Sequence, residues 1–468
     1  MALGLTVTLD PLAAGQLSQW TNDQTPMTDL TGSFSVRGPL SEMQIDGWLR
    51  SEAGDLALNG GLDLTAESMS WALTAQTDRL DLDELLPPVT EPTRLAGSYS
   101  LTGVGTSWPD DVTARIEITA EEQILWGEPV DNLSFAGDIA GGKLTIEDLT
   151  ADHPVAAAGI TGGWVDIVGQ KASVQTDVSL PTLAALARYD QPGYLGSLVS
   201  TGAVEVDWSQ EQLRVDAFPL LVGSSIRGDG FSVGDVRSEG LQVTLIGDEV
   251  FFKGGIVLSE IDAAGLDINT VTLSAIDGDW SARHGVDFST QVDMGRLLVG
   301  DGTFELAGLS GPVSGVVPPV GKPDITSELV LGELTLLPAA YKIDGGPVTL
   351  EMKDNGLEVG LSLSREGRVV IQAQTFGDLD SQQWRVEELS IFPTSERGIV
   401  SLQEVPIRFT LVESGVNDLE LVLVVSDDPT RRTASLDEAS YISMAGGTGG
   451  DEPNLDLEVR RLPLSWVA

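Results

Sequence analysis

The sequence predicts an all-β protein built as one very long antiparallel sheet or as a chain of β-modules, and two observations indicate it. From about Thr31 to Arg460, apolar and polar residues alternate in short stretches that Gly, Asp and Asn separate. No long helical pattern lies between these stretches. A period of two places apolar side chains on one face of a sheet and polar side chains on the other. The apolar face must therefore be covered by protein, shared with a partner or filled by a ligand.

The clearest alternations identify the candidate residues of the apolar face. Each set occupies every second position of one predicted strand, so its members share a face. We expect these side chains to line the face if it stays open, whereas the same side chains would form an ordinary sandwich core if a second layer covered it. The sets are Leu241, Val243 and Leu245; Leu357, Val359, Leu361 and Leu363; and Ile407, Phe409 and Leu411.

A weak internal repeat marks the N-terminal part of the chain. Residues 31–38 (TGSFSVRG) match residues 96–103 (AGSYSLTG) at an offset of 65 residues. We expect each segment to begin a strand whose aromatic residue, Phe34 or Tyr99, points to the apolar face. Units of unequal length on one theme are typical of a quasi-one-dimensional array. Short helical signals are predicted at 78–87, 179–189 and 435–444.

The length of the chain constrains the shape of the sheet. At ordinary strand and turn lengths, roughly 30 to 40 strands fit into 468 residues. Stacked at ~4.8 Å, they would form a ribbon on the order of 150 Å long. Open twisted sheets of that size rarely stay flat, so we expect the ribbon to curl into a trough, to close, or to split into sandwiches.

The composition excludes several classes of function. The chain has 26 Lys and Arg against 71 Asp and Glu, for a net charge of −45. Nucleic-acid binding requires basic stripes that displace counterions, and adsorption to anionic headgroups requires a basic surface, so neither is expected. The charge keeps a β-rich chain soluble and opposes edge-to-edge pairing, although adaptation to a salty environment would produce the same composition.

Membrane and redox signals are also missing from the sequence. The absence of Cys excludes disulfides, thiolate nucleophiles and zinc–thiolate sites. No run of 18 or more apolar residues exists, so we expect no membrane anchor within the chain. The start lacks the basic and apolar regions of a signal peptide, and the end falls within an amphipathic stretch. We therefore expect a fragment of a longer protein.

Candidate catalytic and metal-binding residues are few. His153 and His284 are the only histidines, and we interpret both as loop or strand-end residues. Asp152 precedes His153, but adjacent strand residues point to opposite faces and make a poor chelate. The acidic cluster at 78–84 lacks the central Gly and distal Glu of a calcium loop, so we interpret it as a solvated helix start. We expect no catalytic residue, no metal site and no cofactor.

Three segments resemble a known family. Residues 31–40 (TGSFSVRGPL), 80–87 (LDLDELLP) and 455–464 (LDLEVRRLPL) are similar to the middle repeats of TamB/AsmA-like envelope proteins. The resemblance implies an elongated antiparallel β-sheet curled into a repeating β-groove, a taco-like trough with a few short helices. It also implies a periplasmic location, with an inner-membrane anchor outside this chain.

On this interpretation we expect a groove segment at 1–316 and its continuation at 317–468. The turn at 317–323 (VPPVGKP) is a possible break between them, and 446–453 (GGTGGDEP) is expected to be a mobile loop. The implied function is a non-enzymatic hydrophobic conduit for phospholipid transport between the inner and outer membranes, serving outer-membrane biogenesis and protein assembly. Its expected partners are phospholipid acyl chains, and membrane proteins that dock through regions outside this chain.

Two alternatives remain open. An extracellular β-sandwich adhesin or binding array would have sealed cores and repeat a topology at intervals of roughly 100 residues. A β-helix polysaccharide-active enzyme would need a localised carboxylate or basic cluster on one face, and the sequence shows no such constellation.

Overall fold

The predicted all-β antiparallel fold is confirmed. The described part of the chain is almost entirely β-strand, with one four-residue helix, α2 (Leu82–Leu85). The structure, a computed structural model, describes residues 2–12, 28–85, 91–125, 127–184, 194–210, 212–263, 266–299, 304–337, 341–354, 356–378, 381, 383–391, 399–402, 407–412, 415–426, 440–447 and 454–460.

The chain forms two compact units. Unit 1 comprises Met1–Ile226 and Gln242–Gly247, and unit 2 comprises Arg227–Leu241 and Asp248–Ala468. The division falls within strands β13 (Arg214–Gly228) and β14 (Phe231–Ile246). The Pro-rich turn at 317–323, where the sequence suggests a break, instead connects two paired strands inside unit 2.

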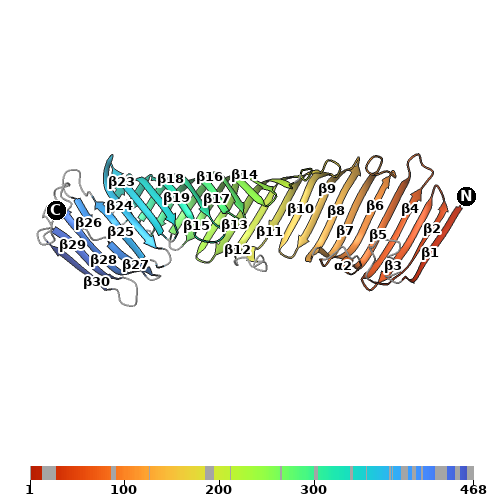
Figure 1. Cartoon of the computed structure of the whole chain (residues 1–468), viewed down its shortest axis with the longest axis horizontal. Helices are drawn as coiled ribbons and strands as arrows, with labels where there is room; N and C mark the ends of the chain where they lie inside the picture. Colours follow the sequence, from red (N-terminus) through yellow and green to blue (C-terminus); the bar gives the residue numbers. More distant parts are fainter. Residues whose placement is uncertain are drawn as a thin grey trace. The chain divides into compact units, whose positions relative to one another are not determined.

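In unit 1, consecutive strands pair antiparallel in chain order from β1 to β12, as the red to light green part of Figure 1 shows. Because each strand follows its neighbour through a short connection, alternate turns lie at the same edge of the sheet. The strands are β1 (Ala2–Leu12), β2 (Leu30–Pro39), β3 (Met43–Ser51), β4 (Gly54–Asp63), β5 (Ser70–Asp81), β6 (Arg94–Val104), β7 (Thr113–Leu125), β8 (Glu128–Ala140), β9 (Lys143–His153), β10 (Ala156–Asp166), β11 (Lys171–Leu180) and β12 (Leu195–Asp207).

In unit 2 the order is interrupted twice. Strand β18 pairs with both β19 and β20, and β19 pairs onward with β22, so the β20–β21 hairpin branches off the main order. Strand β25 similarly pairs with β26 and β27. The strands are β15 (Glu249–Ala263), β16 (Leu266–Ser281), β17 (Gly285–Val299), β18 (Phe304–Val317), β19 (Asp324–Leu331), β20 (Glu333–Leu336), β21 (Tyr341–Ile343), β22 (Gly346–Lys353), β23 (Gly356–Arg365), β24 (Arg368–Asp378), β25 (Gln383–Ile391), β26 (Ile399–Leu402), β27 (Ile407–Val412), β28 (Gly415–Ser426), β29 (Ser440–Gly447) and β30 (Asn454–Arg460).

The helical signals are only partly confirmed. At 78–87 the first residues complete β5 and Leu82–Leu85 form the helix, whereas 86–87 lie outside the described residues. At 179–189 only Leu183 and Ala184 form a short 3₁₀ turn, and 185–189 lie outside the described residues. The signal at 435–444 is wrong for 440–444, which belong to β29 and pair with both β28 and β30. Aromatic and β-branched residues favour a strand there, and two neighbouring strands supply its ladder hydrogen bonds.

The register of unit 1 explains the internal repeat. Phe34 and Tyr99 occupy corresponding positions in β2 and β6, four strands apart, and the paired residues between them are Gly47, Leu58 and Ala75. Residues 65 apart in the sequence therefore lie on the same line of paired residues across the sheet. Of the expected loop at 446–453, Gly446 and Gly447 belong to β29, and the remaining residues lie outside the described ones.

Candidate functional site

Two lines of apolar residues and glycine, interrupted at one position, cross unit 1 at right angles to its strands. Residues paired directly across an antiparallel ladder point to the same face, so each line marks one face of the sheet. We call the lines row A and row B. Row A is Leu5, Val36, Ile45, Gly60, Leu73, Leu101, Ile116, Gly137, Ile146, Gly163, Val174 and Val204. Row B is Val7, Phe34, Gly47, Leu58, Ala75, Tyr99, Ile118, Phe135, Leu149, Ile160, Thr176 and Gly202, with one polar side chain, Thr176, near its end.

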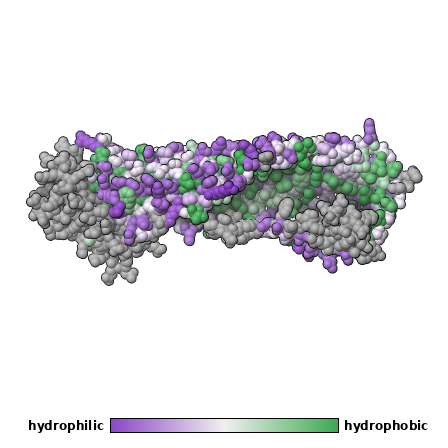
Figure 2. All heavy atoms as spheres, viewed as in Figure 1, coloured by the Kyte–Doolittle hydropathy of each residue, from purple (hydrophilic) through white to green (hydrophobic). Residues whose placement is uncertain are grey.

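The apolar face of unit 1 is not sealed at rows A and B. Among their side chains only Ile146 is buried, at 6% exposed. The others are only partly buried, except at the first strand, where Leu5 is 56% and Val7 47% exposed. Figure 2 shows a hollow lined by hydrophobic residues over the strands of this unit. A molecule from solution can therefore contact these side chains.

Aromatic rings in the floor of this hollow lie against glycines of the neighbouring strand. A Cβ atom added to Gly47 would stand 2.4 Å from Cδ1 of Phe34, and one added to Gly103 would stand 2.7 Å from Cζ2 of Trp71. Glycine at these positions lets the ring lie flat on the backbone. The rings therefore occupy space that side chains would fill at these positions, and the hollow above the sheet is deeper.

One edge of unit 1 carries a small sealed core. Leu30, Ala53, Leu80 and Leu85 form a buried cluster in which α2 covers the end of the apolar face. The neighbouring amide of Asp81 donates to the carbonyl of Ala53 at 2.7 Å. At this edge, protein side chains therefore occupy the apolar face.

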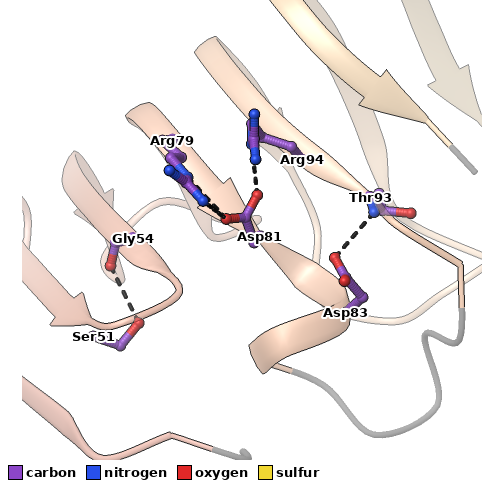
Figure 3. A network of polar contacts seen from close by, with 7 residues as sticks. All are labelled: Ser51, Gly54, Arg79, Asp81, Asp83, Thr93 and Arg94. Carbon is purple, nitrogen blue, oxygen red and sulfur yellow. Dashed lines mark hydrogen bonds and ion pairs between the residues drawn. The ribbon is translucent and has the colours of Figure 1, made fainter. Parts of the chain in front are cut away.

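An ion-pair network stands beside this core (Figure 3). The Asp81 carboxylate, 7% exposed, accepts hydrogen bonds from Arg79 Nη2 at 2.6 Å and from Arg94 Nε at 2.7 Å. Burial alone would raise the pKa of Asp81, but the two guanidinium groups outweigh it and hold the pKa below its ordinary value. Asp83 accepts from the amide of Thr93 at 3.1 Å.

The interpretation of 78–84 as a solvated helix start is therefore wrong for Asp81, which ends β5 and is buried and paired. Nothing in the spacing of the cluster indicated that guanidinium groups from two strands would converge on it. The described residues contain no group of three acidic or histidine side chains able to hold a metal ion.

The histidines lie at strand ends or turns, as expected. His153 is the last residue of β9, and its Nε2 is 3.2 Å from Glu128 Oε2. His284 lies in the turn before β17, where its amide donates to the hydroxyl of Ser281 at 3.2 Å.

Unit 2 carries a comparable line, row C, on which Leu357 lies. It consists of apolar residues and glycine, and by register it reaches position 409 of β27. Row C is Phe252, Gly278, Phe288, Gly315, Ile325, Met352, Leu357, Gly377, Trp384 and Phe409. The side chains of Ile407, Phe409 and Leu411 lie outside the described residues, although their strand is placed.

The second predicted set divides between open and sealed surroundings. Leu357 and Val359 are half-exposed. Leu361 packs against a core cluster, and Leu363 is buried within that cluster at 4% exposed. Leu331 and Ile343 complete the cluster, and Ile343 comes from the short strand β21. The structure therefore places Leu363 against protein rather than on a surface that a ligand could reach.

The first predicted set lies on β14, which the two units share. Leu241 belongs to unit 2, whereas Val243 and Leu245 belong to unit 1, and all three are half-exposed at alternating positions. On the opposite face Thr244 is 9% exposed and donates its hydroxyl to Asp216 Oδ1 at 2.7 Å. That face therefore contains a buried polar contact at this point.

The fold and the site define a class: an antiparallel β-sheet protein with a partly accessible apolar face. No protein-family model, curated protein or solved structure matches the chain. Within the described residues, no helix has the length and apolar character needed to span a bilayer.

Proposed function

We propose that this chain is a non-enzymatic segment of a hydrophobic conduit that holds phospholipid acyl chains against its apolar face. The observation that supports it is the continuity of rows A and B across unit 1 with nearly all their side chains accessible. From β1 to β12 at ~4.8 Å per strand, the rows are on the order of 50 Å long.

The energetics suit transport. Each methylene group removed from water lowers the free energy by about 0.8 kcal/mol, so covering an acyl chain of ~16 carbons lowers it by on the order of 10 kcal/mol. Because successive strands offer similar aliphatic and glycine positions, an acyl chain finds no single deep trap along the rows. Such a surface requires no reacting group, and the polar headgroup can stay at the rim in water.

The proposal extends to a biological setting. A TamB/AsmA-like protein of the bacterial envelope would use such a segment to carry phospholipid across the periplasm in support of outer-membrane biogenesis. In this setting the inner- and outer-membrane partners contact regions outside this chain. Cell fractionation of the full-length protein tests the location, which would be overturned by recovery from the cytoplasm.

The conduit is tested by native mass spectrometry and lipid extraction of the purified chain. We expect phospholipid to copurify with the wild type and to be lost from the double variant Ile116→Asp/Ile118→Asp, which places two charges in rows A and B. The matched control is Thr119→Asp, an exposed position of the same strand on the opposite face.

Two results would contradict the conduit: a wild-type chain without lipid, or a double variant that keeps it while remaining folded. A folded, lipid-free wild type that binds a surface ligand would support the adhesin alternative instead.

A further inference from the structure

The two long edges of unit 1 differ in the solvent exposure of the apolar side chains in their turns. Alternate turns of the meander fall at the same edge. At one edge, the turns that join β2 to β3, β4 to β5, β6 to β7, β10 to β11 and β12 to β13 carry large apolar side chains that are 41% to 61% exposed. We call this edge the exposed rim. Its apolar residues are Leu40, Leu64, Trp108, Ile167, Val168 and Leu213.

At the other edge, the buried rim, the apolar residues that the structure describes in the connections are covered. Ala53 between β3 and β4 is 0% exposed, and Leu85 of α2 and Val155 between β9 and β10 are each 9% exposed. Leu183, after β11, is also buried. Among the described connections, one set therefore covers its apolar residues and the other set exposes them to solvent.

The exposed rim is an ordered structure rather than a row of separate loops. Neighbouring turns are hydrogen-bonded to one another. The amide of Leu64 donates to the carbonyl of Leu40 at 2.8 Å, and the amide of Ile167 donates to the carbonyl of Gly142 at 3.0 Å. A Cβ atom on Gly142 would stand 2.5 Å from Val168 and 3.0 Å from Pro109, so three successive turns of this edge touch there. The apolar side chains are therefore held in place along the edge.

The apolar surface continues from the floor to this rim. In β4 the alternation runs from Gly60 of row A through Leu62 to Leu64 of the rim, and in β10 it runs from Gly163 through Val165 to Ile167. Leu62 pairs with Trp71, and Val165 pairs with Leu144, so the intermediate positions are apolar on the neighbouring strands too. No polar side chain interrupts either path.

We infer that the exposed rim is the side at which phospholipid acyl chains pass laterally between a bilayer and the apolar face of unit 1. The inference rests on the proposed function and names its point of access. Exposed apolar side chains lower the free energy of a hydrocarbon tail as it crosses the edge, because the tail stays in contact with apolar surface throughout. The described connections of the buried rim offer no such path, since their apolar residues already contact protein.

The charge at the rim selects the headgroup. Glu42, Glu67, Asp110 and Asp111 lie exposed in the same turns. The exposed cations at this edge include Lys143, which begins β9, and Lys171, which begins β11 and pairs with Asp207, so acidic groups predominate. These carboxylates repel the net negative charge of an anionic headgroup, whereas they attract the ammonium group of a zwitterionic phospholipid. The occupant is accordingly a zwitterionic phospholipid.

The test measures transfer kinetics. Fluorescent phosphatidylcholine in phosphatidylcholine vesicles is the donor, and the rate and final amount of lipid taken up by the chain are recorded. The double variant Leu64→Asp/Ile167→Asp changes the two exposed rim residues at which these paths end. We expect uptake about tenfold slower, as for a barrier raised by about 1.4 kcal/mol, with the final amount within about twofold of the wild type because rows A and B are intact.

The matched control is Leu195→Asp, 53% exposed at the opposite edge at the start of β12. It should leave the rate unchanged, and thermal unfolding should confirm that all variants are folded. A wild-type rate in the rim variant, or equal slowing by Leu195→Asp, would overturn the access route while leaving the conduit standing. A wild type that takes up no lipid would overturn both.

Discussion

The two units share the alternation of apolar and polar residues but differ in how far their apolar faces are covered by protein. In unit 1, rows A and B remain accessible from β1 to β12, and the sealed core is confined to the edge beside α2. In unit 2, the β20–β21 hairpin brings Ile343 (2% exposed) against Leu331 and Leu363, and these seal part of the face. Whether an apolar face is open therefore depends on small additions to the sheet rather than on the strands themselves.

This difference assigns different tasks to chemically similar side chains. Leu363 and Ile118 both occupy apolar positions of a regular strand, but Leu363 is surrounded by protein and Ile118 is only partly buried. Stability is expected to depend on the sealed clusters, whereas the open rows are left available for a ligand.

The largest predicted effect compares these two positions directly. Leu363→Asp buries a carboxylate without a partner and should destabilise unit 2 by several kcal/mol. Ile118→Asp leaves its carboxylate in contact with water, so its cost should stay near 1 kcal/mol. Hydrogen exchange read separately over β23 and β7 measures both. Equal losses of protection at the two sites would mean that the face of unit 1 is sealed after all.

Part of this arrangement could be predicted from the sequence. The spacing of Leu357, Val359, Leu361 and Leu363 correctly places them in one strand, β23. Ile343 lies in a strand of three residues, which is too short to show any period, so the sealing of Leu363 left no signal. Tertiary contact decides which member of a set is open, and a periodic pattern contains no information about that contact.

The glycines of the rows show a signal that was present but interpreted differently. Glycine commonly separates strands, yet Gly60 lies between Leu58 and Leu62 at the same phase as these apolar residues. Gly137 lies likewise between Phe135 and Ile139. A glycine in apolar phase within a strand indicates a floor position against which a neighbouring side chain can lie.

An intermediate effect is expected from filling one of these floor positions. Gly47→Val places a side chain where the ring of Phe34 now lies, and overpacking of this kind costs about 1–3 kcal/mol. If the face is open, the ring can swing into the hollow, so the cost should stay near 1 kcal/mol while lipid loading falls. The control is Gly159→Val in β10, where an added Cβ has no neighbour closer than 3.5 Å. A loss near 3 kcal/mol at Gly47 would indicate that a covering layer blocks the ring.

The smallest effect concerns the sealed edge of unit 1 and its dependence on pH. The pKa of Asp81 is lowered from its ordinary value of 3.8, so the carboxylate stabilises the folded state above that pH. The contribution is lost as the pH falls through the lower, folded pKa, where the proton displaces the guanidinium hydrogen bonds. Asp81→Asn should cost about 1–2 kcal/mol at neutral pH and should flatten the dependence below pH 3.8.

The amides of Asp81 and Leu82 are the natural reporters, because they donate to the carbonyls of Ala53 and Thr93, each at 2.7 Å. Their hydrogen exchange, corrected for the intrinsic pH dependence, should accelerate in acid in the wild type, and in Asp81→Asn already at neutral pH. Asp207 provides the control: the hydroxyl and amide of Ser209, together with Lys171, lower its pKa to about 2, but it lies on β12, away from α2. Asp207→Asn should therefore leave both amides unchanged. If it accelerated them as Asp81→Asn does, the acid sensitivity would belong to unit 1 as a whole, and the contrast between its sealed edge and its open face would not hold.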